Sequence, residues 1–380
     1  MAKEKKQEQS RSTKFIISGG GTGGHIFPAI SIANAIKNQL PDAEILFVGA
    51  LGRMEMERVP AAGYPIKGLP VSGFDRKNML KNLKVLWNLQ QSIRQARRIV
   101  KEFKPDAAVG VGGYASAPVL KAASAMGVAT VLQEQNSYAG VTNKLLAKKA
   151  ALICVAYEGM ECFFPKEKIL LTGNPVRQDL LSIAPKTKEA YEFFNFDPNK
   201  KTLLIVGGSL GARTINQSII AHLDKLTDSG IQILWQTGKF YIDGAREAAA
   251  SSTSPNLLVT DFVSRMDYAY SIADLVVSRA GASSISEICL LGKPVILVPS
   301  PNVAEDHQTQ NALALLRKEA AIMIKDSEAG EKLVDKALEI LSDDTTLKKL
   351  SVNVKKLAQE NSADRIATEI IKLSLRSSHK

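Results

Sequence analysis

Short apolar runs alternate with longer amphipathic stretches along the chain. In the first half, apolar residues at helical spacing predict helices over His25–Gln39 and Lys81–Phe103. The apolar runs between and around them are too short for helices and predict buried strands at Lys14–Ser18, Glu44–Val48, Ala107–Val111, Ala129–Leu132 and Leu152–Val155. Apolar strands that alternate with helices are typical of a parallel, doubly wound α/β sheet.

The same pattern begins again at Thr202, with amphipathic helices over Lys325–Leu375 at the end of the chain. The strands predicted here are Thr202–Val206, Ile231–Gln236, Leu257–Thr260, Leu275–Ser278 and Pro294–Val298. Each half opens with a strand, a glycine loop and a helix, so the sequence predicts two Rossmann-like domains. Prolines place their boundary near Gly173–Ile183. We expect a ligand in the cleft between the halves, at the carboxyl ends of the strands.

Length and cysteine content agree with two globular domains. The chain has 380 residues and only three cysteines, without a paired CxxC motif, which argues against a disulfide framework or a cysteine-built zinc site and fits a reducing compartment. No apolar stretch reaches the 18 or so residues of a membrane span. Residues 1–13 are polar, lack the apolar core of a signal peptide and are expected to form a disordered tail.

Charge is distributed unevenly along the chain. The net charge is +11, but residues 1–177 hold 25 basic and 13 acidic side chains, a balance of +12, whereas the remainder carries −1. This excess of positive charge predicts that the first half of the chain binds an anionic partner. No nucleic-acid-binding module is visible, so we expect no nucleic acid.

A basic amphipathic stretch, Phe74–Lys104, predicts contact with an anionic membrane surface. The expected membrane residues are Phe74, Met79, Leu80, Leu83 and Trp87 with Arg76, Lys77, Lys81 and Lys84. The alternative is that the apolar stripe faces the core and the basic side chains are only solvated.

The first glycine loop, Gly19–His25, follows a predicted strand and opens a helix. Glycines let a backbone approach a phosphate, and a helix N-terminus supplies N–H groups and positive potential, so we interpret the loop as a phosphate cradle. It lacks the Lys-Ser/Thr of a Walker A loop, and the second strand lacks the ribose-binding acid of a dinucleotide fold. The simpler alternative is a tight strand-to-helix turn.

His25 begins the helix after this loop. A helix N-terminus disfavours the imidazolium, so the neutral ring can act as a general base. The alternative is a polar residue that only starts the helix. A second glycine loop, Gly110–Pro118, could hold another anionic group or could simply be a flexible connection.

The third glycine loop, Gly207–Gly211, also fits the GxSxG elbow of α/β-hydrolases, with Ser209 as nucleophile and Asp261 and His307 following in the required order. A hydrolase would not explain the other loops or the repeated architecture. Further on, Ser284 and Glu287 form either a helix-capping box or part of a diphosphate site in which Glu287 holds a ribose. No Asp-x-Asp pair is present, so no metal is expected to bind a diphosphate.

Together these motifs resemble the MurG family, the bacterial N-acetylglucosaminyltransferases that convert lipid I into lipid II. The similarity runs from about Lys14 to Ile370. The segments that carry it are Gly20–His25, Gly112–Tyr114, Glu134–Asn136, Thr172–Arg177, Gly207–Ala212 and Ser283–Glu287. One departure is Gln133, where many relatives carry histidine before Glu134-Gln135-Asn136.

The resemblance implies a GT-B fold with an acceptor- and membrane-binding domain (14–177, joined by a final helix at 364–375) and a donor domain (178–363). It implies inverting, metal-independent transfer without a cofactor, with His25 as the first choice for the base and Glu134 as the second. UDP-N-acetylglucosamine would contact Thr22, Gly23, Gly24, Asn136, Arg177, Ser209, Val263, Ala282, Ser283, Ser284, Ile285, Ser286, Glu287 and Gln308. The diphosphate of the acceptor, undecaprenyl-diphosphate-MurNAc-pentapeptide, would meet Gly20, Gly21, Gly112, Gly113 and Tyr114.

The resemblance also implies a peripheral protein at the cytoplasmic face of the bacterial inner membrane, with cell-wall synthesis and division proteins as possible partners. Three other hypotheses stay open: a UDP-sugar epimerase of the same fold, the serine hydrolase, and a non-catalytic scaffold. The epimerase would turn over the sugar nucleotide without an acceptor.

Overall fold

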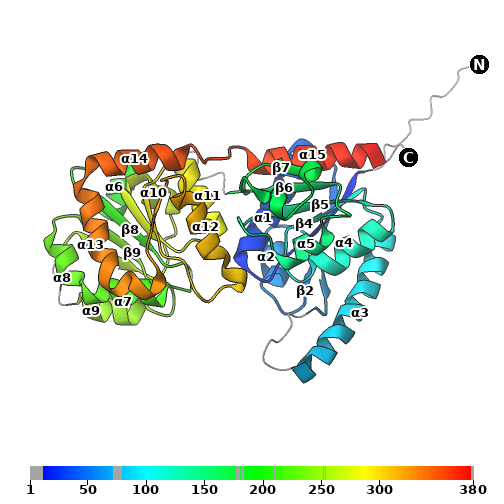
Figure 1. The fold of residues 1–380 in the computed structure, drawn as a ribbon, viewed down its shortest axis with the longest axis horizontal. Helices are drawn as coiled ribbons and strands as arrows, with labels where there is room; N and C mark the ends of the chain where they lie inside the picture. Colours follow the sequence, from blue (N-terminus) through cyan, green and yellow to red (C-terminus); the bar gives the residue numbers. More distant parts are fainter. Residues whose placement is uncertain are drawn as a thin grey trace, which may run out of the picture. The chain divides into compact units, whose positions relative to one another are not determined.

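The computed structural model describes residues 12–71, 79–176, 180, 184–208, 210–250, 252 and 254–377. The chain forms two compact units (Figure 1). The first contains the chain up to Gln135, Ala139–Pro175 and the end from Asn361 onward; the second contains Asn136–Tyr138 and Val176–Glu360. The chain therefore passes into the second unit just after Pro175 and returns to the first for its last helix.

The first unit is built on a parallel sheet whose described strands run in the order β3-β2-β1-β4-β5-β6-β7. The strands are β1 (Lys14–Ser18), β2 (Glu44–Ala50), β3 (Ile66–Leu69), β4 (Ala107–Gly110), β5 (Ala129–Glu134), β6 (Leu152–Val155) and β7 (Ile169–Leu171). The helices are α1 (Gly23–Gln39), α2 (Glu55–Ala61), α3 (Met79–Phe103), α4 (Ser116–Ala125), α5 (Val141–Leu146) and α15 (Ser362–Ser377). Both faces of the sheet are buried, because Phe15 and Ile17 belong to one apolar cluster and Ile16 to another.

The final helix, α15, packs against α1. Ala363, Ile366 and Ile370 are buried in the same apolar cluster as α1. Gln39 Nε2 donates to the Asp364 carbonyl (2.9 Å), and Thr368 Oγ1 donates to Gln39 Oε1 (2.9 Å). Burial of an apolar stripe thus fixes the chain end to the first unit.

The second unit repeats the design with a parallel sheet in the order β10-β9-β8-β11-β12-β13. The strands are β8 (Thr202–Val206), β9 (Gln232–Gln236), β10 (Leu257–Thr260), β11 (Leu275–Ser278), β12 (Val295–Leu297) and β13 (Ile322–Met323). The helices are α6 (Lys188–Phe194), α7 (Arg213–Ala221), α8 (Leu223–Asp228), α9 (Ile242–Ala249), α10 (Met266–Ile272), α11 (Ala282–Leu291), α12 (His307–Leu316), α13 (Ala329–Ser342) and α14 (Asp344–Lys355). Trp235 is fully buried in the core, and its indole N–H donates to Asn216 Oδ1 (2.9 Å).

Each sheet has one point at which the strand order reverses direction. In the first unit this point lies between β1 and β4, and in the second it lies between β8 and β11. A crevice opens at the carboxyl ends of the strands at such a switch point, and ligands of open α/β sheets bind there. The glycine loops after β1, β4 and β8 all follow these strands.

Helix α3 carries most of the predicted membrane stretch, and its first turns extend away from the sheet (Figure 1). Phe74, Arg76 and Lys77 lie outside the described residues. The side chains of Met79, Leu80, Lys81, Leu83 and Lys84 do so as well. Trp87 is 64% exposed, whereas Ala96, Ile99 and Val100 in the later turns are buried in the core. Among the described residues, no helix is long and apolar enough to span a bilayer.

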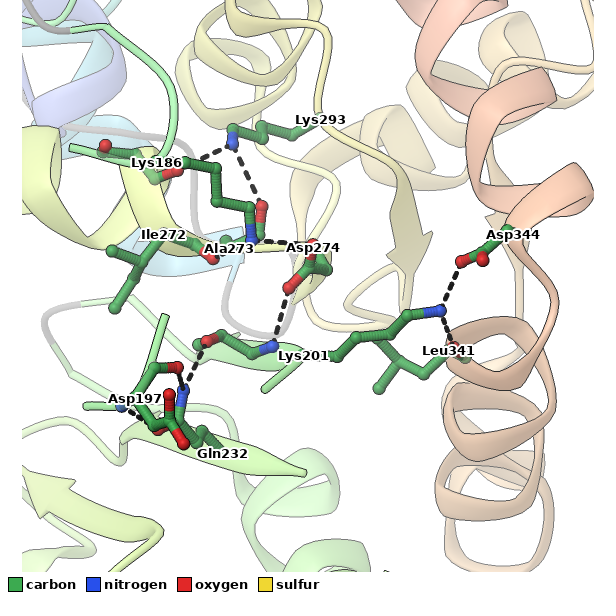
Figure 2. Close-up of polar contacts among 12 residues, drawn as sticks. Lys186, Asp197, Lys201, Gln232, Ile272, Ala273, Asp274, Lys293, Leu341 and Asp344 are labelled. Atoms are coloured by element: carbon green, nitrogen blue, oxygen red, sulfur yellow. Dashed lines mark hydrogen bonds and ion pairs between the residues drawn. The ribbon is translucent and has the colours of Figure 1, made fainter. Parts of the chain in front are cut away.

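A buried lysine lies at the amino ends of the strands of the second unit, opposite the switch point. Lys293 is 8% exposed, and its Nζ donates to the carbonyls of Ser271 (3.3 Å) and Ala273 (3.0 Å) at the end of α10 (Figure 2). Lys186 donates to Asp274 nearby (2.7 Å). Burial, assisted by repulsion from Lys186, lowers the pKa of Lys293 to about 8.

This lowered pKa predicts a stability that depends on pH. Between about pH 8 and 10 the unfolded chain keeps a proton on Lys293 that the folded chain has released, so raising the pH favours folding. The free energy of unfolding of the wild type, relative to Lys293→Met, should rise by up to about 1.4 kcal/mol per pH unit there. Urea unfolding of both proteins from pH 7 to 10 measures this difference; a difference independent of pH would contradict it.

Candidate active site

The first glycine loop uses its glycines for two different purposes. A Cβ on Gly19 would lie 2.1 Å from Val111 Cγ2, and a Cβ on Gly20 would lie 2.2 Å from Glu55 Cδ, so both glycines permit close packing. Gly21 has nothing within 4 Å of such a Cβ, and the nearest atom at Gly24 is Thr22 Oγ1 at 3.7 Å. The side of the loop that is open to a ligand is therefore formed by Gly21 and Gly24.

Helix α1 begins directly after this loop and presents its N-terminus beside it. Thr22 is the N-cap; its carbonyl accepts from His25 N (3.1 Å) and Ile26 N (3.2 Å). Its hydroxyl is not engaged as a side-chain cap and lies 3.2 Å from His25 Nδ1. The first turn of α1 itself contains no acidic residue, and the nearby Glu55 carboxylate accepts from Gly21 N (2.9 Å), just before the N-cap.

The second glycine loop packs against the first. A Cβ on Gly112 would lie 2.8 Å from His25 Nε2, and a Cβ on Gly113 would lie 2.4 Å from the Gly20 carbonyl oxygen. Both glycines have positive φ values (95° and 83°), which ordinary side chains rarely adopt. Tyr114 follows, 52% exposed. The backbone of the second loop at Gly112 therefore lies against one edge of the His25 imidazole ring.

Glu134, the second candidate for the base, lies at the end of β5 and is only 2% exposed. Its Oε2 accepts hydrogen bonds from Gly140 N (3.0 Å) and Asn143 Nδ2 (2.9 Å). This geometry suits a carboxylate that holds the following loop in place. The more exposed His25 is therefore the better candidate for proton transfer.

Gln133, which departs from the motif of the family that the sequence resembles, points into the interior. It is fully buried, and its Nε2 donates to Asn174 Oδ1 (2.9 Å), while Asn174 Nδ2 donates to the Gln135 carbonyl (3.0 Å). The Gln133 side chain therefore belongs to a buried amide network.

The second unit contains a cavity of about 660 Å³ at its switch point. It lies between the glycine loop after β8 and the N-terminus of α11. Two predicted donor-binding residues, Ser284 and Gln308, line it, and Gln308 is oriented because its Oε1 accepts from Ser300 N (2.9 Å). Two others, Ser209 and Arg177, lie outside the described residues.

The three charged residues that line this cavity, Arg213, Arg279 and Asp326, were not predicted as site residues. Arg279 follows β11 directly, donates to the Val298 carbonyl (3.0 Å) and forms a mostly buried ion pair with Asp326. Asp326 also accepts from Thr214 Oγ1 (2.9 Å). Arg213 is the first residue of α7 and is exposed. Arg279 could have been predicted from the sequence, because it comes immediately after a strand at the switch point.

The capping-box interpretation of Ser284 and Glu287 is wrong. Helix α11 starts at Ala282 with Gly281 as N-cap and has no side-chain cap, so Ser284 is already inside the first turn. Glu287 instead accepts a hydrogen bond from Tyr270 OH (3.2 Å). Its carboxylate lies one turn beyond the N-terminus of the helix that borders the cavity.

The other predicted donor residues take different positions. Val263 and Ile285 are buried (3% and 2% exposed) and do not line the cavity. Ala282, Ser283 and Ser286 belong to the first turns of α11, where Ser286 Oγ donates to the Ala282 carbonyl (2.9 Å). Thr22, Gly23 and Gly24 form the start of α1 in the first unit.

Asn136 belongs to the three-residue segment of the second unit. Its Oδ1 accepts from Asn311 Nδ2 (3.1 Å), which also donates to the Ala280 carbonyl (3.2 Å) just before α11. In the part of the chain that the structure describes, no cluster of histidine, cysteine or acidic side chains could hold a metal ion.

Two Rossmann-like units, each with a glycine loop at its switch point, are the architecture of the GT-B fold. Models of glycosyltransferase family 28 match both halves, the N-terminal domain over residues 15–155 and the C-terminal domain over residues 202–367. The chain belongs to this family and is a glycosyltransferase, and the predicted fold class is confirmed.

Curated relatives and a crystal structure are similar over nearly the whole chain. The UDP-N-acetylglucosamine--N-acetylmuramyl-(pentapeptide) pyrophosphoryl-undecaprenol N-acetylglucosamine transferase of Phocaeicola vulgatus is 67% identical, over 95% of this chain and 96% of its own. The protein of the same name from Parabacteroides distasonis is 63% identical, over 96% and 99%. The crystal structure of Acinetobacter baumannii MurG has a TM-score of 0.78 at 27% identity, over 95% of this chain and 99% of that one.

Proposed function

We propose that this protein transfers N-acetylglucosamine from UDP-N-acetylglucosamine to undecaprenyl-diphosphate-MurNAc-pentapeptide, giving lipid II and UDP for peptidoglycan synthesis. The observation that carries the proposal is the 67% identity, over 95% of the chain, to a transferase named for these substrates. The same similarity favours transfer over epimerisation and over serine hydrolysis.

The cavity of the second unit suits the donor. The first turn of α11 contains no acidic residue, so its N–H groups and positive dipole can face a diphosphate, and Arg213 adds a full charge at the rim. Gln308, which lines the cavity, is proposed to bind sugar hydroxyls, and Glu287, farther along α11 and not among the lining residues, is proposed to bind the ribose. Arg279, which forms an ion pair with Asp326, also donates to the Val298 carbonyl and so connects the end of β11 to the loop after β12.

The first unit suits the diphosphate of the acceptor. The N-terminus of α1, with the open faces of Gly21 and Gly24, offers N–H groups without a competing first-turn carboxylate. In the proposed mechanism His25 removes the proton from the muramyl 4-hydroxyl. That oxygen attacks the anomeric carbon in line, inverts its configuration and expels UDP. Helix dipoles and arginine, rather than a metal ion, stabilise the departing diphosphate.

We further propose that the protein binds the cytoplasmic face of the inner membrane peripherally. The proposal is supported by the positive excess of residues 1–177 and by Trp87, which is 64% exposed on the projecting part of α3. Sedimentation with vesicles that contain anionic lipid should retain the protein, and retention should fall as salt is raised. Equal retention on neutral vesicles would contradict the electrostatic part of this proposal. Cell-wall synthesis and division proteins are proposed partners at the same surface.

The transfer proposal is tested by UDP release from UDP-N-acetylglucosamine, with and without a short-chain lipid I analogue, in the presence of EDTA. Release that requires the analogue and persists with EDTA is expected. Release without the analogue would indicate hydrolysis of the sugar nucleotide, a change of sugar configuration without UDP release would indicate an epimerase, and loss of release in EDTA would contradict the metal-independent mechanism.

A further inference from the structure

A buried carboxylate lies beneath the first glycine loop. Glu55, the first residue of α2, is 1% exposed. Its Oε2 accepts from Gly21 N (2.9 Å) and its Oε1 accepts from Ala50 N (2.9 Å). One side chain thus connects the loop after β1 to the end of β2. Burying a charge is costly unless its hydrogen bonds are made, and here each oxygen has a backbone donor.

Two glycines make room for this side chain. A Cβ on Gly20 would lie 2.2 Å from Glu55 Cδ, and a Cβ on Gly49 would lie 2.5 Å from Glu55 Cγ. Cβ atoms essentially never approach other atoms this closely. Glycine at both positions therefore leaves the space that the Glu55 side chain occupies.

The two hydrogen bonds require an acceptor at each side-chain oxygen of Glu55. Both partners are N–H donors, so glutamine, which is nearly isosteric with glutamate, would direct its NH₂ group toward one of them. The hydrogen bond to Gly21 also determines which N–H groups of the loop are available to a ligand. Because the Gly21 N–H is already used, an anion must be bound by the N–H groups of α1 instead.

The effect of Glu55 extends to His25 through Gly21 and Thr22. Gly21 precedes Thr22, the N-cap of α1, whose carbonyl accepts from His25 N and whose hydroxyl lies 3.2 Å from His25 Nδ1. Fixing Gly21 therefore fixes the first turn of α1 and one edge of the imidazole ring. The backbone of Gly113 packs on Gly20 from the other side, so the loop has little freedom to adjust.

We propose that Glu55 is a positioning residue for glycosyl transfer: its carboxylate holds the first glycine loop so that the N-terminus of α1 and His25 face the acceptor. This inference rests on the function proposed above. Glu55 itself does not touch substrate, so its loss should slow the reaction without weakening the donor site of the second unit.

The test compares Glu55→Gln with Glu57→Gln, an exposed glutamate on the same helix, and with Val59→Ala, a buried apolar residue of α2 that makes neither hydrogen bond. We expect Glu55→Gln to lower kcat by about tenfold or more, while the Kd for UDP-N-acetylglucosamine stays within about twofold. Hydrogen exchange of the Gly21 and Ala50 amides should also be faster, by about tenfold. Glu57→Gln should change none of these quantities.

Two results would overturn the proposal. One is a kcat of Glu55→Gln within about twofold of wild type. The other is an equal loss of kcat in Val59→Ala at a matched loss of thermal stability, because α2 would then matter only as structure. If Glu55→Gln does not fold, Glu55→Asp replaces it, because aspartate keeps the charge but has a shorter reach. We again expect a lower kcat and an unchanged Kd for UDP-N-acetylglucosamine.

If the proposed transfer reaction itself is wrong, the experiments give a different result from those that overturn the role of Glu55. Wild-type protein without acceptor-dependent UDP release would remove the transfer reaction itself. The amide exchange comparison would still decide the role of Glu55 in that case: faster exchange at Gly21 in Glu55→Gln supports loop positioning, and unchanged exchange refutes it.

Discussion

Replacing His25 with alanine should lower kcat by roughly 10²–10⁴, the usual contribution of a positioned general base. The Kd for UDP-N-acetylglucosamine should barely change, because the donor cavity lies in the other unit. His25 suits this role because it stands in the first turn of α1, is only partly buried, and lies 3.2 Å from the hydroxyl of Thr22 through Nδ1. Steady-state UDP release and calorimetric donor binding measure the two quantities.

The matched control for this substitution is His222→Ala in the second unit, where the ring Nδ1 lies 3.0 Å from the Ser218 carbonyl. It should leave kcat unchanged. Near-normal turnover in His25→Ala would contradict the assignment of the base. The role would then pass to Glu134 despite its burial, and Glu134→Gln would be the next variant to measure.

Replacing Glu287 with alanine should weaken donor binding by about 1–3 kcal/mol if its carboxylate holds the ribose through charged hydrogen bonds. This substitution is informative because Glu287 does not cap α11, whose N-cap is Gly281. Helix stability and donor affinity can therefore change independently. Calorimetric titration with UDP-N-acetylglucosamine gives the affinity, and urea unfolding gives the stability.

The control for Glu287→Ala is Tyr270→Phe, which removes the hydroxyl that donates to Glu287 and leaves the carboxylate in place. It should cost much less affinity. Unchanged affinity in Glu287→Ala together with reduced stability would mean that the residue serves the fold, through Tyr270, and not the nucleotide.

The central strands were predictable because burial on both faces leaves a continuous apolar run. All ten predicted strands are present, with ends shifted by at most two residues. The strands that the pattern does not predict are β3, β7 and β13, which are short, partly exposed and all at the sheet edges. Such strands bury less apolar surface, so they leave only a weak pattern in the sequence.

The candidate site was predictable where the chemistry is local to one loop. Glycine loops and helix starts are contiguous in sequence, so the phosphate cradle and His25 could be proposed from residues alone. Glu55 could not, because its role depends on Gly21 and Ala50, which the fold brings to it from two strand ends. The pairing of Arg279 with Asp326 could not be predicted for the same reason, because the two residues are 47 positions apart. The start of α11 was misplaced because glycine, rather than serine, is its N-cap.

The central claim is that an N-acetylglucosamine unit moves from the nucleotide to the lipid-linked muramyl sugar. The most direct test is to incubate the protein with UDP-N-acetylglucosamine and a lipid I analogue and to identify the products by mass and by the configuration of the new linkage. We expect an acceptor heavier by one N-acetylhexosamine unit, joined with inverted anomeric configuration, in amounts equal to the UDP released. An unmodified acceptor alongside epimerised or hydrolysed sugar nucleotide would contradict it.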